Sequence, residues 1–169
     1  MDFFIILFVF IILWTAAIAG LSFAPWVPSK KRDFERIFKL ANLQPGEIFY
    51  DLGCGTGKVA IYAYKKFKAK SIGLEIAIPF YLICKWRQIF NPGTIFKYKN
   101  LYKENLGQAD VIYFFGTPKT INEKLKSKLE KEVRPGARII SYVFCINGWN
   151  PVIVDKPNDK SMPIFLYIK

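Results

Sequence analysis

The sequence predicts an α/β fold in which a mostly parallel sheet carries helices on its faces and an antiparallel hairpin at one edge. Short apolar runs alternate with amphipathic stretches of helical period over residues 33–144, which is the pattern of parallel sheets. Two more short runs, Val152–Val154 and Ile164–Ile168, follow without a helix between them, which favours an antiparallel pair. An uncharged N-terminal stretch predicts one transmembrane helix before this domain.

The N-terminal stretch covers residues 3–24 and contains no charge. As a helix it is about 33 Å long, near the hydrocarbon thickness of a bilayer. Lys30-Lys31-Arg32 follow at once, so we expect a single-pass protein with its folded domain on the cytoplasmic side. A signal peptide is the alternative because Ala17-Ile18-Ala19 resembles a cleavage site, but Asp2 is the only preceding charge where a base is expected.

The chain divides into an anchor (residues 1–24), a Pro-rich basic linker (25–32) and one folded domain (33–169). Helical spacing of apolar residues from Asp33 to Leu43 predicts the first helix of the domain, with Asp33 as its cap. Later helices are expected at Gly57–Phe67, Pro79–Phe90 and Ile121–Val133. The expected strands are Ile48–Leu52, Ser71–Glu75, Ile95–Tyr98, Asp110–Phe115, Ala137–Phe144, Val152–Val154 and Ile164–Ile168.

Composition restricts the function classes. The 169 residues carry a net charge of +12, which suits an anionic membrane surface; the scattered lysines form no dense stripe for nucleic acid, so no nucleic-acid partner is expected. The chain has no histidine and no CxxC pair among its three cysteines. We therefore expect no metal site and reduced thiols.

The most informative motif is the run from Tyr50 to Lys58, Tyr-Asp-Leu-Gly-Cys-Gly-Thr-Gly-Lys, where a buried strand turns into a helix. It is not a P-loop, since Leu52 stands at the first glycine position and Val59 at the Ser/Thr position. It is not a dinucleotide fingerprint, since Lys58 replaces the third glycine. Alternating glycines beside an acid let backbone approach a nucleotide-like ligand.

Glu75 ends the second expected strand, 24 residues after Asp51, which suits one βαβ crossover and a carboxylate that holds ribose hydroxyls. Asn100, after the third strand, is a candidate for the adenine amine, with Leu101 covering the ring; a turn is the other interpretation of Asn100. These features together predict an S-adenosylmethionine pocket. Its candidate residues are Asp51, Gly53, Cys54, Gly55, Gly57, Glu75, Asn100 and Leu101.

The acceptor is expected beyond the fourth strand, because ligands of open α/β sheets bind at the carboxyl ends of strands. Of the aromatic residues there, we expect Phe115 to reach the cleft and the others to be core. Together with Trp26, Phe115 is a candidate for the lining of an apolar substrate channel at this edge. The channel candidates are Trp26, Phe115, Gly116, Thr117 and Pro118.

The chain resembles the small, single-anchor protein-lysine methyltransferases that modify the mitochondrial adenine nucleotide translocase and the ATP-synthase c-subunit. The resemblance extends from the anchor to about Pro151 and is carried by five groups of residues: Ala24–Pro28, the glycine loop with Gly73-Leu74-Glu75, Phe115–Pro118 with Lys128-Leu129-Glu130, Pro135–Arg138 and Trp149-Asn150-Pro151. Departures from the family pattern are Asn100 for an aspartate, Ile78 for a polar residue and Lys58 for an arginine.

The resemblance implies a Rossmann-like, seven-stranded class I methyltransferase sheet and transfer of a methyl group to a lysine of a membrane-embedded protein. Two alternatives stay open from the sequence. One is a methyltransferase of a lipid or quinone, which the same anchor would serve. The other is a non-enzymatic membrane protein that binds the cofactor or nucleic acid.

Overall fold

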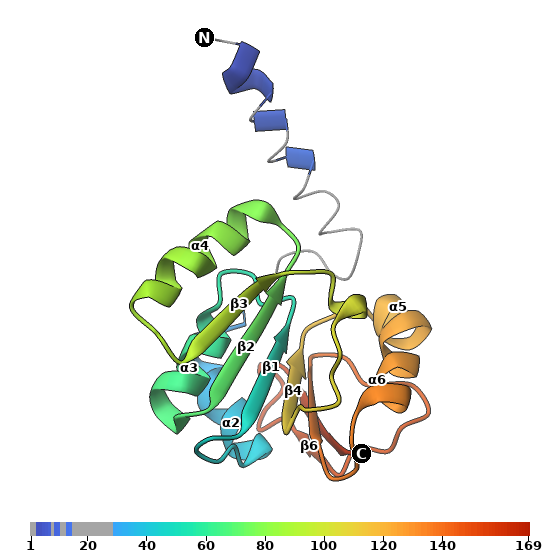
Figure 1. Ribbon diagram of the computed structural model, residues 1–169. Helices are drawn as coiled ribbons and strands as arrows, with labels where there is room; N and C mark the ends of the chain where they lie inside the picture. Colours follow the sequence, from blue (N-terminus) through green and yellow to red (C-terminus); the bar gives the residue numbers. More distant parts are fainter. Residues whose placement is uncertain (1–2, 8, 11–12, 15–28) are drawn as a thin grey trace.

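The structure is a computed structural model that describes residues 3–7, 9–10, 13–14 and 29–169. Its folded part is one seven-stranded sheet of order β3-β2-β1-β4-β5-β7-β6, with helices on both faces (Figure 1). The strands are β1 (Ile48–Leu52), β2 (Lys70–Glu75), β3 (Thr94–Tyr98), β4 (Val111–Phe114), β5 (Arg138–Tyr142), β6 (Ile153–Asp155) and β7 (Ile164–Ile168). All seven expected strands are therefore present, with ends that differ by at most two residues.

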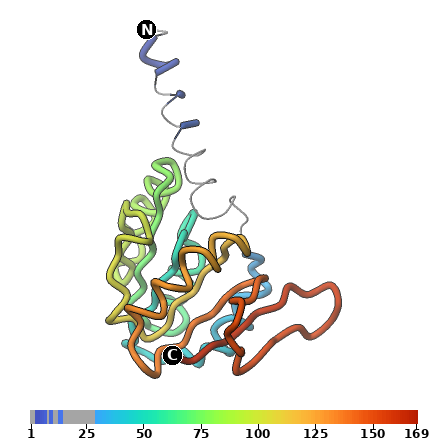
Figure 2. The backbone as a smooth tube through the Cα atoms, turned by 90° about the vertical axis from the view of Figure 1, so that its right-hand side faces the viewer, coloured from blue at the N-terminus to red at the C-terminus, as the bar shows by residue number. Residues whose placement is uncertain are grey.

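The sheet direction agrees with the sequence prediction. Strands β1 to β5 pair in parallel, whereas β7 is antiparallel to both β5 and β6. This is the expected hairpin at one edge, and Figure 2 shows it at the side of the molecule away from α4. The chain order reverses between β1 and β4, which is the switch point beside which open α/β sheets bind ligands.

Helices α2 (Phe34–Ala41), α3 (Lys58–Phe67) and α4 (Ile78–Ile89) lie on one face of the sheet, where a cluster of buried side chains joins them to the strands. The other face is covered by a continuous helical stretch made of α5 (Pro118–Thr120), the π-helical segment η3 (Ile121–Leu125) and α6 (Lys126–Glu132). Short 3-10 turns stand at η1 (Lys31–Asp33) and η2 (Leu101–Lys103). Two buried clusters, one on each face, thus form the core.

The first helix of the domain differs from the prediction at both ends. Asp33 does not cap α2 with its side chain, so that prediction is wrong; its buried carboxylate instead accepts hydrogen bonds from Arg36 and Tyr142. The helix ends at Ala41 and is capped by Asn42, whose φ of 46° is left-handed, a conformation that Asn tolerates. The stretch expected at Ile121–Val133 starts three residues earlier, at Pro118, because Thr117 caps it.

The predicted anchor lies mainly outside the described residues. Those of its residues that the structure describes, at 3–7, 9–10 and 13–14, are helical and exposed. Within residues 3–7, 9–10, 13–14 and 29–169, no helix has both the length and the apolar character needed to cross a bilayer.

Candidate functional site

The glycine loop connects the carboxyl end of β1 to α3. Gly53, Gly55 and Gly57 have φ values of 78°, 53° and 74°, a left-handed conformation that L side chains rarely adopt. The N–H groups of Gly53 and Cys54 both donate to the Leu74 carbonyl, at 3.0 and 2.9 Å. The end of β2 therefore holds the loop over the carboxyl edge of the sheet.

Glu75 holds the same loop with its side chain. Its Oε2 accepts from the N–H of Gly55, and its Oε1 accepts from the N–H groups of Ile76 and Ala77, each at 2.8 Å. Burial raises the pKa of Glu75, and these three hydrogen bonds oppose that shift. The structure thus brings Glu75 to the glycine loop, as expected; contact with ribose hydroxyls stays a prediction.

Asp51 is the carboxylic acid of the site whose pKa departs most from its ordinary value. Only 2% of it is exposed, and its Oδ2 atom has no hydrogen-bond partner. Burial, and to a smaller extent the negative charge of Glu75, raises the pKa of Asp51 to about 8, against a hydrogen bond from the Ala60 backbone. Because a buried carboxylate oxygen without a partner is costly, this atom points to a ligand that carries positive charge.

A thiol and a phenyl ring under the loop, those of Cys84 and Phe96, have no role in the sequence prediction. The Cys54 and Cys84 sulfurs lie 3.9 Å apart, and the Cys84 thiol donates to the Gly55 carbonyl at 3.1 Å. A Cβ added at Gly57 would lie 2.6 Å from the Phe96 ring, and one at Gly73 would meet the same ring at 2.6 Å. Gly57 and Gly73 are thus required by close packing against Phe96. The spacing of the motif alone does not predict this packing.

The expected adenine end lies after β3. The Asn100 side chain accepts a hydrogen bond from the Tyr102 N–H at 3.0 Å and so caps η2, while Leu101 is buried beside it. The turn-forming role considered for Asn100 is therefore present. An amide oxygen has a second lone pair that can accept from an adenine amine, and that contact stays a prediction.

The residues after β4 form a bend that leads into α5. Phe115 is half-buried and its ring lies 6.2 Å from that of Tyr142, and Gly116 is buried. Thr117 accepts from the Thr120 N–H at 3.2 Å, and Pro118 is the first residue of the helix. The bend therefore starts a helix and presents Phe115 at the carboxyl edge. The fifth channel candidate, Trp26, lies outside the described residues.

Two tyrosines near Phe115 connect the start of the domain to the end of the parallel strands. The Tyr113 hydroxyl lies 2.6 Å from the Ser29 hydroxyl. The Tyr142 hydroxyl donates to Asp33 at 2.7 Å. Burial raises the pKa of both tyrosines well above its ordinary value, so both stay protonated. Tyr113 is buried, as predicted for the core, whereas no sequence pattern indicates a role for Tyr142.

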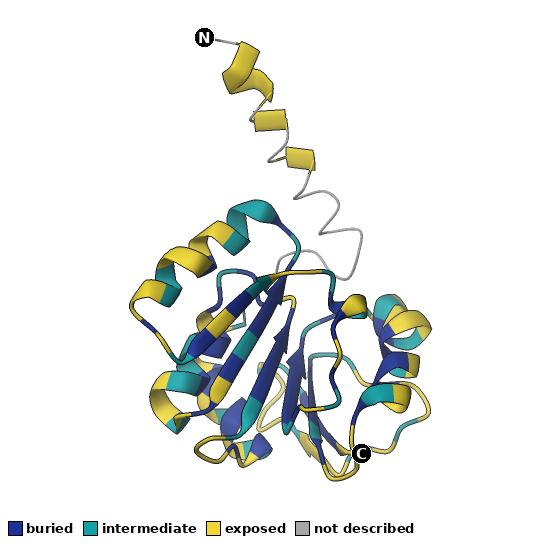
Figure 3. Cartoon of the chain, in the orientation of Figure 1, coloured by how far each residue is buried: buried dark blue, intermediate teal, exposed yellow. Residues whose placement is uncertain are grey.

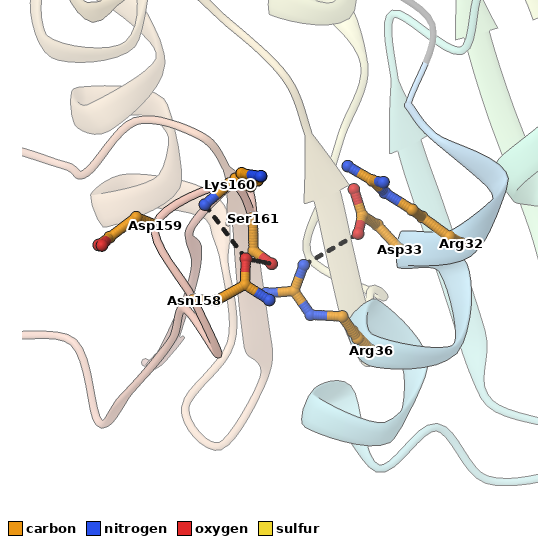
Figure 4. Close-up of a pocket in the computed structure, with 7 residues that line it drawn as sticks. All are labelled: Arg32, Asp33, Arg36, Asn158, Asp159, Lys160 and Ser161. Atoms are coloured by element: carbon orange, nitrogen blue, oxygen red, sulfur yellow. Dashed lines mark hydrogen bonds and ion pairs between the residues drawn. The ribbon is translucent and has the colours of Figure 1, made fainter.

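A cavity of about 570 Å³ opens beside this contact, between the start of α2 and the loop that joins β6 to β7 (Figure 4). It lies at the carboxyl edge, because Tyr142, the last residue of β5, pairs with Ile164, the first of β7. Arg36 lines the cavity, and its guanidinium forms ion pairs with the carboxylates of Asp33 and Asp155, each at 2.9 Å. The lining residues are Arg32, Asp33, Arg36, Asn158, Asp159, Lys160 and Ser161.

The glycine loop and the Asp51 carboxylate suit S-adenosylmethionine. The loop glycines leave room for close approach, and the unpartnered Oδ2 of Asp51 is matched by the cationic methionine end of this cofactor. Among the residues that the structure describes, no group of three or more His, Cys, Asp or Glu side chains is placed to hold a metal ion.

Comparison with known proteins shows the family of the chain. The profile of the family described as "ANTKMT methyltransferase domain" matches residues 51–153. A protein-lysine N-methyltransferase of Saccharolobus islandicus is 36% identical over 85% of this chain and 92% of its own length. The human lysine N-methyltransferase of the ATP-synthase c-subunit is 30% identical over 75% of this chain, which spans only 54% of that longer relative.

Among solved structures, the RNA methyltransferase from Salinibacter ruber in complex with S-adenosyl-L-homocysteine superposes with a TM-score of 0.79. It shares 21% identity over 84% of this chain and 93% of its own, which shows the common class I fold. The family match covers more than half of the chain and includes the whole glycine loop. The chain therefore belongs to the ANTKMT methyltransferase family and is an S-adenosylmethionine-dependent methyltransferase.

Proposed function

We propose that this enzyme methylates a lysine side chain of a membrane-associated protein. The observation that carries the proposal is the buried carboxylate of Asp51, whose Oδ2 atom has no hydrogen-bond partner, at the same sheet edge as the aromatic residues Phe115 and Tyr142. Support for a lysine acceptor comes from the relatives, which are named as lysine N-methyltransferases of proteins in general, of the ATP-synthase c-subunit and of the adenine nucleotide translocase.

The residues of the chain would divide the work between binding and desolvation. S-adenosylmethionine supplies an electrophilic methyl group on a sulfonium. Asp51 would bind the cofactor's ammonium, and the loop braced by Glu75 would fix its position. These groups orient the donor, so no histidine base is needed for the transfer itself.

The acceptor amine must be uncharged before it attacks. An apolar surrounding disfavours the ammonium form and lowers a lysine pKa, and Phe115 with Tyr142 and Phe144 provides such a surrounding. The ring of Phe115 would then stabilise the methylated, cationic product by cation–π contact. Phe115 is thus our principal candidate on the acceptor side.

Membrane attachment would bring such an acceptor within reach. Residues 3–24 are long and apolar enough to cross the bilayer as a helix, and Lys30–Arg32 favour a catalytic domain on the cytoplasmic side. A tether of this kind raises the local concentration of membrane-embedded substrates. The acceptor would then be a lysine close to the cytoplasmic membrane surface.

The test is incubation of the purified full chain with its membranes and cofactor labelled in the methyl group. We expect label that stays with protein after solvent extraction, and mass spectrometry that finds methyl-lysine in an integral membrane protein. The matched control is Asp51→Ala, which should label nothing. Label that moves into the organic solvent would instead indicate a lipid or quinone acceptor, and cofactor binding without any transfer would indicate a non-enzymatic role.

A further inference from the structure

Helix α4 carries an apolar outer face. Among the twelve residues of this fully described helix, only Cys84 is buried. Leu82, Trp86 and Ile89 are 56%, 62% and 72% exposed, and Phe90, which follows the helix, is 67% exposed. Figure 3 shows the corresponding exposed stretch along α4 at the surface of the molecule. These four residues are called the α4 face below.

The α4 face is continuous and ordered. Its members are spaced by four, three and one residues, so they lie along one side of the helix. The rings of Trp86 and Phe90 pack edge to face, with centroids 5.8 Å apart. A contiguous apolar patch of large side chains marks an interaction surface rather than scattered exposure.

The charges around this face indicate what covers it. Helix α4 contains Lys85 and Arg87 and no acidic residue, within a chain of net charge +12. Apolar residues with a tryptophan beside basic residues are typical of helices that lie in the headgroup region of anionic bilayers. A second copy of the chain is a poor fit, since a two-fold contact would bring Lys85 and Arg87 against like charges.

The position of α4 also favours a bilayer. The helix starts at Ile78, three residues after Glu75 at the carboxyl end of β2. Ser29, the first described residue after 15–28, contacts Tyr113 near the carboxyl end of β4. The apolar N-terminal stretch and the first turn of α4 are therefore both connected to the sheet edge that carries the cofactor loop.

We propose that the α4 face docks into the headgroup region of an anionic bilayer as a second membrane contact of the folded domain. The domain is then held by two points, the N-terminal stretch and α4. The carboxyl edge between them faces acceptors at the membrane surface. The inference rests on the proposed function for its purpose, but its test needs no methyl transfer.

The experiment uses the full chain with Trp86 as the only tryptophan, obtained by Trp14→Phe, Trp26→Phe and Trp149→Phe. The protein is reconstituted into phosphatidylglycerol–phosphatidylcholine vesicles whose acyl chains are brominated near the headgroup. The matched control keeps Trp149 alone; that side chain bonds Glu130 and packs on Tyr167, in the buried cluster of the other sheet face. Thermal unfolding shows that each variant is folded.

We expect the brominated lipid to quench Trp86 emission about twofold and to leave Trp149 emission unchanged, because only an interfacial side chain meets the bromine atoms. Adding Leu82→Ser and Ile89→Ser should abolish that quenching while the protein still floats with the vesicles. Equal emission of Trp86 in brominated and plain vesicles overturns the proposal. So does a detergent-dispersed dimer in which Trp86 is already shielded from iodide, since a second copy then covers the face.

Discussion

The Glu75 carboxylate accepts a hydrogen bond of 2.8 Å from the Gly55 N–H, so the end of β2 fixes the loop that follows β1. The two residues are 20 apart in sequence and meet because β1 and β2 are parallel neighbours. This contact links the fold to the cofactor site, since loop position depends on a side chain from another strand.

Replacing Glu75 should therefore weaken both the fold and cofactor binding. Glu75→Ala leaves the Gly55, Ile76 and Ala77 N–H groups without their acceptor, and each hydrogen bond to a charged group is worth about 1.5–3 kcal/mol. We expect a lower urea midpoint and at least about tenfold weaker binding of S-adenosylhomocysteine. Unchanged affinity in calorimetry would show that the loop keeps its position without Glu75.

Asp51 predicts a pH dependence of stability. Its pKa is raised from 3.8 in the unfolded chain to about 8 in the folded one. The associated stability is fully present below 3.8 and is lost as the pH rises towards 8, because over this range the unfolded chain releases a proton that the folded state still binds. Asp51→Asn should thus raise the melting temperature of the ligand-free protein at pH 8–9 relative to wild type, with little change at pH 4.

The same group predicts a pH dependence of cofactor binding. A cationic ligand favours ionised Asp51, so binding below pH 8 releases a proton, and the affinity should rise by up to about tenfold per pH unit until pH 8. Calorimetry in two buffers of different ionisation enthalpy counts the protons. Asp51→Asn should bind weakly at every pH and release none. Proton uptake by the wild type would contradict the assigned role.

Alanine substitutions at two glycines with similar φ values, Gly46 and Gly57, distinguish the cost of backbone strain from the cost of side-chain overlap. Alanine at Gly46, with φ of 83° and no atom within 4 Å of its Cβ, should cost about 1–2 kcal/mol of unfolding free energy. Alanine at Gly57, with φ of 74°, also meets the Phe96 ring at 2.6 Å and should cost clearly more. Urea denaturation of both variants is the measurement; equal losses would mean that the loop adapts to a Cβ.

Substitutions at Phe115 should affect turnover of the acceptor without affecting cofactor binding. Phe115→Leu should lower the turnover of the protein acceptor about tenfold, because it removes the ring that we propose to stabilise the cationic product. Phe115→Tyr keeps that ring and should retain most activity. Cofactor affinity should be the same in all three proteins, so a parallel loss of affinity would place Phe115 in the cofactor site instead.

Much of the fold could be predicted because strand and helix patterns are local. The strand Ile48–Leu52 has the predicted ends. The loop after it could be predicted because Asp51 and the alternating glycines are recognisable in the sequence itself. Contacts between distant residues could not be predicted in the same way. Asp33 looked like a helix cap, but Tyr142, 109 residues later, donates to its carboxylate.

The sequence pattern also does not predict backbone strain or the burial of individual side chains. Val143 has a φ of 78° just after β5, a conformation that costs a β-branched residue energy and that no local signal indicates. The exposed α4 face followed a correctly predicted helix, yet its apolar residues gave no sign of which would be buried. Burial depends on neighbouring elements, and among the described residues none covers the outer side of α4.

The central claim is that the carboxylate and glycines after β1 bind a sulfonium cofactor. Isothermal titration of the purified chain with S-adenosylmethionine and S-adenosylhomocysteine tests it most directly. The account predicts one site per chain for each ligand, with binding abolished by Asp51→Ala and kept by Gly46→Ala. No heat of binding for either ligand with folded wild-type protein would contradict it.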